Sequence, residues 1–161
     1  MKIGTPYCIA AIAFLSACTA SGPTFTRAPD PPPGQALVYV YRPLRGTAAL
    51  RDTYFSIDGV ALASISQGGY TWVHVKAGAH KIKQRWSLLD VPYLPADGMQ
   101  WARDWKEGQT YFYRFTPEYI GNRTFKYTLT EVPESTALSE IGQTQYQSAQ
   151  NAENFRVLES R

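Results

Sequence analysis

Cysteine is scarce in this chain of 161 residues, and its placement is informative. Both cysteines, Cys8 and Cys18, lie within the first eighteen residues. A domain formed by the rest of the chain therefore contains no disulfide framework, no cysteine-ligated zinc and no cysteine nucleophile. At this length a hydrophobic core alone can stabilise one domain.

Histidine is equally scarce, which argues against a metal site. The two histidines, His74 and His80, flank Ala77-Gly78, which we predict to be a hairpin turn between strands 70–76 and 79–86. A two-residue turn would place the imidazoles on opposite faces of the sheet, whereas a three-residue loop would place them on one face. We expect structural or surface roles for both, and neither a metal nor a cofactor.

Charge of one sign is also limited, since the net charge is only +3. A nucleic-acid partner is not expected, because binding one requires a stronger and clustered basic excess. We interpret the single basic group as the solvated face of a strand pair. This group consists of Lys76, Lys81, Lys83 and Arg85.

Catalytic motifs are missing as well. The sequence has no glycine-rich phosphate loop, no nucleophile elbow and no His-Glu-x-x-His pair. We therefore predict a protein without enzymatic activity and without catalytic residues. The alternative is a carboxylate-dependent hydrolase acting on envelope glycans, with Asp90, Asp97 and Asp104 in one irregular stretch.

The N-terminus, in contrast, carries a clear pattern. Lys2 precedes a short apolar segment over residues 7–15, which is too short to span a bilayer but suits a signal peptide. Leu15-Ser16-Ala17-Cys18 then resembles the bacterial lipobox. The resemblance implies that residues 1–17 are removed and that Cys18 becomes the lipid-carrying N-terminus, anchoring the protein in a membrane. The alternative is an ordinary secretory signal cleaved a few residues later.

The residue after the cysteine bears on location. An Asp at this position commonly retains such lipoproteins in the inner membrane, whereas this chain has Thr19. The resemblance therefore implies the bacterial outer membrane, with the protein facing the periplasm.

Residues 18–35 form the next unit, which is rich in proline. Pro31-Pro32-Pro33 favours extended polyproline II, so we predict a semi-rigid tether between anchor and domain. A proline-rich ligand for a partner protein is the alternative.

From residue 36 to 132 the pattern is that of a β domain. Short aromatic and β-branched segments alternate with turns, of which Asp58-Gly59 is the strongest hairpin signal because both positions favour positive φ. We predict an all-β fold, a small antiparallel sandwich or barrel in which consecutive strands pair. The expected strands are 36–42, 53–57, 60–66, 70–76, 79–86, 110–116 and 123–132.

Two other parts of the chain are less regular. Residues 87–109 are predicted to form a long loop with a short strand around residues 88–93. Residues 133–161 are expected to form a C-terminal helix that opens at Pro133, followed by a polar tail that either extends the helix or is disordered.

Aromatic residues are abundant, with eleven Tyr, seven Phe and four Trp. Several gather around the irregular stretch and form a candidate ligand or partner surface. The alternative is that the two tryptophans four residues apart cap the open end of the sandwich. The candidate surface consists of Trp86, Tyr93, Trp101 and Trp105.

Four segments together resemble a known family. They are residues 37–43 (Leu-Val-Tyr-Val-Tyr-Arg-Pro), Ile57-Asp58-Gly59, Gly69-Tyr70 and residues 75–80 (Val-Lys-Ala-Gly-Ala-His). Their order resembles the DUF2846 family of uncharacterised bacterial lipoproteins, and their spacing is similar to that of PEGA-type domains. The resemblance covers residues 36–86 well and 109–132 loosely, and it implies an envelope β-sandwich similar to prealbumin-like modules.

The resemblance implies no established activity and no catalytic residues. Together with the anchor it leads us to expect a non-enzymatic binding or scaffolding module of the cell envelope. Its partner would be an envelope protein or peptidoglycan. A structural subunit of a larger envelope complex is the remaining alternative.

Overall fold

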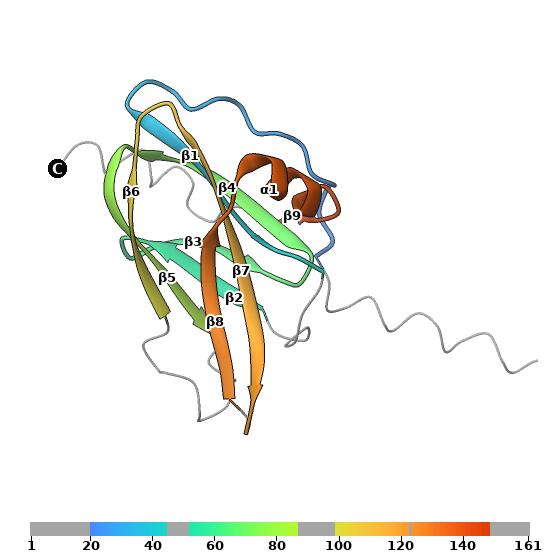
Figure 1. Cartoon of the computed structure of the whole chain (residues 1–161). Coiled ribbons are helices and arrows are strands. Elements are labelled where there is room, and N and C mark those ends of the chain that lie inside the picture. Colours follow the sequence, from blue (N-terminus) through green and yellow to red (C-terminus); the bar gives the residue numbers. More distant parts are fainter. Residues whose placement is uncertain (1–19, 45–51, 87–98, 123, 149–161) are drawn as a thin grey trace, which may run out of the picture.

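The computed structural model of the chain describes residues 20–44, 52–86, 99–122 and 124–148. Two β-sheets pack face to face, and one helix lies on the outer face of the larger sheet (Figure 1). The fold is an all-β sandwich with a C-terminal helix, as the sequence predicts. In chain order the elements are β1 (Gln35–Arg42), β2 (Thr53–Ile57), β3 (Val60–Ile65), β4 (Gly69–Lys76), β5 (Gly78–Trp86), β6 (Met99–Trp105), β7 (Thr110–Gly121), β8 (Thr124–Glu131), α1 (Glu134–Ile141) and β9 (Gln145–Tyr146).

The strand order differs from a series of hairpins. The five-stranded sheet has the order β8-β7-β1-β4-β9, and the four-stranded sheet has the order β3-β2-β5-β6. β1 pairs parallel with β7, and β4 pairs parallel with β9, so the fold is not purely antiparallel. Consecutive strands pair at β2–β3, β5–β6 and β7–β8.

The predicted hairpin around Ala77-Gly78 is wrong. β4 pairs with β1, while β5 pairs with β2 and β6, so the chain crosses here from one sheet to the other. Gly78 adopts a φ of 132°, a conformation that glycine accepts without steric cost. The strands flanking this turn were predicted correctly, but their pairing was not, because a tight turn can also serve as the corner of a sandwich.

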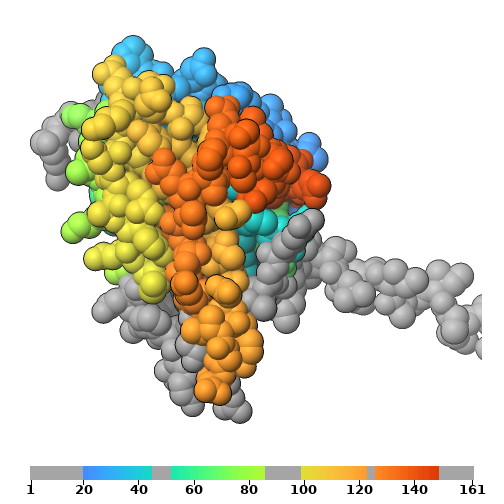
Figure 2. Space-filling view, viewed as in Figure 1, coloured from blue at the N-terminus to red at the C-terminus, as the bar shows by residue number. Residues whose placement is uncertain are grey.

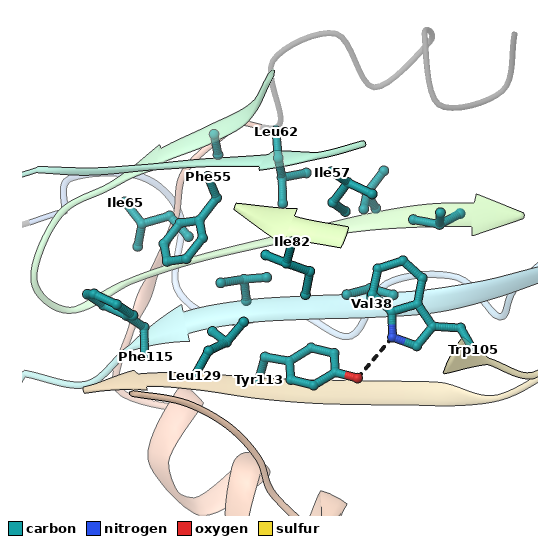
Figure 3. Packing of buried hydrophobic residues seen from close by; sticks show 14 of the residues in the cluster. Val38, Phe55, Ile57, Leu62, Ile65, Ile82, Trp105, Tyr113, Phe115 and Leu129 are labelled. Carbon is teal, nitrogen blue, oxygen red and sulfur yellow. Dashed lines mark hydrogen bonds between the residues drawn. The ribbon is translucent and has the colours of Figure 1, made fainter. Parts of the chain in front are cut away.

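β1 is the central strand of the larger sheet, and all eight of its residues are buried. Alternate side chains enter two different cores. Val38 and Val40 lie between the sheets (Figure 3), whereas Tyr39 and Tyr41 lie on the outer face. Burial on both faces explains why this strand reads as a continuous apolar and aromatic run.

The side chains on the outer face of the larger sheet form a second core, which we call the outer core. The predicted tether covers part of it and shields it from water. Phe25 packs against Tyr39 and Tyr70, with ring centroids 6.1 and 5.3 Å apart. The amide of Ala28 donates a hydrogen bond to the hydroxyl of Tyr39 at 2.7 Å. Residues 20–34 are therefore not a free spacer in this structure, because their polar backbone and apolar side chains find partners on the sheet.

Helix α1 covers the rest of this face. It begins after Pro133, as predicted, and buries Ala137 and Ile141. The Glu140 carboxylate accepts hydrogen bonds from the Tyr41 hydroxyl and from Arg114, each at 2.6 Å. Burial is the main cause that raises the pKa of Tyr41, and the neighbouring Glu140 raises it further. Residues 142–148 do not extend the helix, and Gln145–Tyr146 pairs with the sheet edge as β9. The rest of the predicted polar tail, residues 149–161, lies outside the described residues.

One strand was missed entirely. Residues 99–105 form β6, inside the stretch predicted to be a loop. Among its inward-facing side chains, Arg103 lies between two tryptophans. This charged residue breaks the alternation of apolar and polar residues that identifies a strand. The strand predicted around residues 88–93 lies outside the described residues.

Candidate functional site

The four predicted aromatic residues do not form one surface. Trp105 is only 1% exposed and belongs to the core between the sheets, so its assignment to an exposed surface is wrong. Trp101 is half-buried and packs against the same core. The side chain of Trp86, at the end of β5, and the whole of Tyr93 lie outside the described residues.

The indole of Trp105 is buried with its polar atom satisfied. Its Nε1 donates a hydrogen bond to the Tyr113 hydroxyl at 2.9 Å (Figure 3). That hydroxyl in turn donates to Glu131 at 3.2 Å, and the Arg103 guanidinium lies 5.0 Å from the centre of the tyrosine ring. Burial raises the pKa of Tyr113 to about 12. The phenol therefore stays protonated at neutral pH and links hydrogen bonds rather than acting as a base.

His80 lies beside this group and is also structural. Its Nδ1 lies 2.6 Å from the Asp58 carboxylate, and its Nε2 lies 2.7 Å from the Lys76 carbonyl. The imidazole also stacks on Trp105 at 4.9 Å. His80 thus joins the β2–β3 turn to the crossover between the sheets.

His74 lies in the other sheet, where its Nε2 contacts the Pro29 carbonyl at 3.0 Å. The structural roles predicted for both histidines agree with these contacts. Over the described ranges, no three His, Cys, Asp or Glu side chains gather where they could hold a metal ion. The same part of the chain contains no helix that is long and apolar enough to cross a membrane.

The carboxylates of the hydrolase alternative are described only in part. Asp104 has a 59% exposed side chain that pairs with Lys106 at 2.7 Å. The hydrogen bond with Asp104 raises the pKa of Lys106. Asp90 and Asp97 lie outside the described residues, so the carboxylate pair of the hydrolase alternative stays a prediction.

The predicted lipid attachment residue, Cys18, also lies outside the described residues, which begin at Ala20. The amide of Ala20 donates to the Gln67 carbonyl at 3.2 Å, and Ala20 is 7% exposed. The side chain of Gln67 donates to the Leu44 carbonyl at 2.6 Å. The N-terminal segment is thus fixed at one end of the larger sheet, where β1 ends and β4 begins. We call this place the entry point of the chain.

Exposed large apolar side chains mark three places on the described surface. Tyr119 and Ile120 are 51% and 58% exposed at the tip of the β7–β8 hairpin, and Leu44 is 49% exposed beside the entry point. These residues are not among the candidates for a ligand or partner surface that the sequence indicates. The sequence does contain a signal for their exposure. Adjacent residues of a strand point to opposite faces of the sheet, so Tyr119 and Ile120 could not both enter one core. Tyr54 on β2, at 42%, is also exposed.

The comparisons with known proteins give one match. Residues 32–125 match the model of the family described as "Protein of unknown function (DUF2846)". No curated protein and no solved structure matches the chain. The matched range includes both sheets from just before β1 into β8, and it ends before helix α1.

Proposed function

The chain belongs to the DUF2846 family, and we propose from its own residues that it is a membrane-anchored envelope lipoprotein with a non-enzymatic binding or scaffolding role. Lipid chains on Cys18 would hold it at the periplasmic face of the bacterial outer membrane. The observation that carries this proposal is the motif Leu15-Ser16-Ala17-Cys18, which ends two residues before Ala20, the first described residue. The partner would be an envelope protein or peptidoglycan.

The fold supports a role that depends on where the domain is held and how it is oriented at the membrane. Trp105 is buried in the core between the sheets with its N–H bonded, and both ring nitrogens of His80 are within hydrogen-bond distance of protein partners. Because Ala20 is bonded to the domain, an anchor at Cys18 would hold the sandwich close to the bilayer and in a limited range of orientations. Several acyl chains at one residue give stable anchoring, whereas one chain is marginal.

The anchor is tested by the variant Cys18→Ala, and the other cysteine provides the matched control. We expect the parent to fractionate with membranes, with a mature N-terminal cysteine whose mass includes a diacylglyceryl group and an acyl chain. Cys18→Ala should lose both properties, while Cys8→Ala should keep both because Cys8 is removed with the signal peptide. If Cys18→Ala matures and fractionates like the parent, the proposed anchor is wrong.

The binding role needs a separate experiment. In cells treated with a crosslinker, the lipidated protein should yield a defined envelope adduct, or it should sediment with purified peptidoglycan. The adduct should weaken in Cys18→Ala because the soluble protein is no longer concentrated at the membrane. Absence of both an adduct and sedimentation would contradict a binding role and leave the anchor unaffected.

A further inference from the structure

The β7–β8 hairpin extends well beyond the rest of the larger sheet. Arg114 on β7 lies opposite Tyr41 on β1, and β1 ends one residue later, at Arg42. β7 continues for seven residues past Arg114, to Gly121. At a rise of about 3.3 Å per residue this is roughly 23 Å of strand. Figures 1 and 2 show the hairpin as a finger that projects from the body of the domain.

Two apolar side chains are exposed next to the turn of this finger, and a polar pair lies just behind them. Tyr119 and Ile120 are more than half exposed and precede the turn formed by Gly121 and Asn122. Glu118 and Lys126 lie opposite each other in the register, one step closer to the sandwich, and both are exposed. An exposed apolar pair followed by a charged pair matches the change in polarity from the interface of a bilayer to the water outside it.

The entry point of the chain lies at the same end of the larger sheet. β1 and β7 are parallel, so both end in this direction. Gly69 pairs with the last residue of β1, and Ala20 is bonded to Gln67, two residues before Gly69. The exposed Leu44 follows β1 at the same place. In Figure 1 the described chain begins, in its darkest blue, beside the end of β1, on the side toward which the finger points.

The distance from the entry point to the lipid is short. Cys18 precedes Ala20 by two residues, which span at most about 7 Å of extended chain. An anchored domain would therefore rest on the membrane with this end, and the hairpin would be directed at the bilayer instead of into the periplasm.

We propose that the tip of the β7–β8 hairpin is a second membrane contact, in which Tyr119 and Ile120 insert into the interface of the bilayer that holds the lipid chains of Cys18. This rests on the proposed lipidation of Cys18. Tyrosine suits the interface because its ring is apolar and its hydroxyl remains hydrated, and isoleucine gains by leaving water. Two contacts instead of one fix the tilt of the sandwich on the membrane.

The test uses the mature lipidated protein in vesicles of phosphatidylethanolamine and phosphatidylglycerol. Cys8 is lost with the signal peptide and the Cys18 thiol is blocked by lipid, so one introduced cysteine can be labelled with an environment-sensitive fluorophore. The two variants are Ile120→Cys at the tip and Gln109→Cys at the opposite end of β7, where the residue is also exposed. Thermal unfolding of both labelled variants should match that of the parent.

We expect the label at residue 120 to shift its emission to shorter wavelength on reconstitution and to be quenched by a lipid-attached quencher. The label at residue 109 should do neither. Equal responses of the two labels in protein whose N-terminal mass shows the lipid would overturn the second contact and leave the anchor intact. A shift at residue 120 that occurs without vesicles and rises with protein concentration would assign the tip to a protein contact and overturn the proposal. Protein that lacks the lipid and does not float with vesicles would overturn both proposals.

Discussion

At the scale of single residues, the buried aromatic side chains depend on their polar atoms. Trp105 can lie in the core because the Tyr113 hydroxyl accepts its N–H, and that hydroxyl is satisfied in turn by Glu131. An unsatisfied buried donor costs far more than the net gain from an ordinary hydrogen bond. The position of Trp105 thus follows from a partner on another strand.

The substitution Tyr113→Phe tests this pair. It leaves the buried Trp105 N–H without its acceptor, so we expect the free energy of unfolding to fall by about 1–3 kcal/mol. Tyr111→Phe is the matched control, because the Tyr111 hydroxyl accepts from the exposed amide of Lys106, which water can reach. Urea denaturation measures both, and equal losses would contradict the argument.

Tyr113 also predicts a pH dependence. Its pKa rises from 10.0 to about 12 on folding because burial disfavours the phenolate. The folded state thus retains a proton that the unfolded state releases, and stability is full below pH 10 and falls as the pH rises toward 12. Burial raises the pKa values of Tyr39 and Tyr70 in the same direction.

Urea titrations between pH 10 and 12 measure the free energy of unfolding at each pH. This free energy should fall less steeply with rising pH in Tyr113→Phe than in the parent. The fall should not disappear, because the other buried tyrosines still titrate. An unchanged slope would show that Tyr113 ionises alike in the folded and unfolded states.

At the scale of elements, the segment 20–34 changes role between sequence and structure. Its prolines predict a tether, yet the amides of Thr26 and Ala28 bond the hydroxyls of Tyr70 and Tyr39. Proline-rich chain suits such a cover, because it has few amides that need partners and little conformational freedom to lose on docking. The segment is as much a part of the outer core as helix α1.

Phe25→Ala should loosen this cover. The half-buried ring contacts Tyr39 and Tyr70, so we expect a loss of about 1–2 kcal/mol in unfolding free energy. Hydrogen exchange at the amides of Thr26 and Ala28 should accelerate more than exchange within β1. Ser21→Ala, an exposed change in the same segment, is the control and should leave these rates unchanged.

At the scale of the whole molecule, stability rests on two cores that share β1. One core lies between the sheets, and the other lies under residues 20–34 and α1. The sequence has no cysteine after Cys18, so no disulfide contributes within the domain. A reductant should therefore leave the thermal midpoint of the mature protein unchanged. A lower midpoint in its presence would reveal a disulfide between two chains through Cys18.

The residue types alone specify the local structure. The turn at Asp58-Gly59 has φ values of 48° and 85°, and the turn at Gly121-Asn122 has 96° and 46°. These conformations follow from the residue types alone, because few side chains tolerate positive φ. The alternation along the strands and the helix start after Pro133 are equally local. The family resemblance, confirmed by the match over residues 32–125, depends on these same features.

Which segments meet depends on packing between distant parts of the chain. The crossover at Gly78, the parallel pairing of β1 with β7, and strand β6 all depend on contacts between distant parts of the chain. The burial of Trp105 and the exposed hairpin tip follow from these pairings. The physical reason lies in what the pattern of a strand contains. It shows that one face of the strand must be buried, but it does not specify which segment of the chain will cover that face. Tyr39 required a cover, and the chain supplied it from residues 20–34 and from α1.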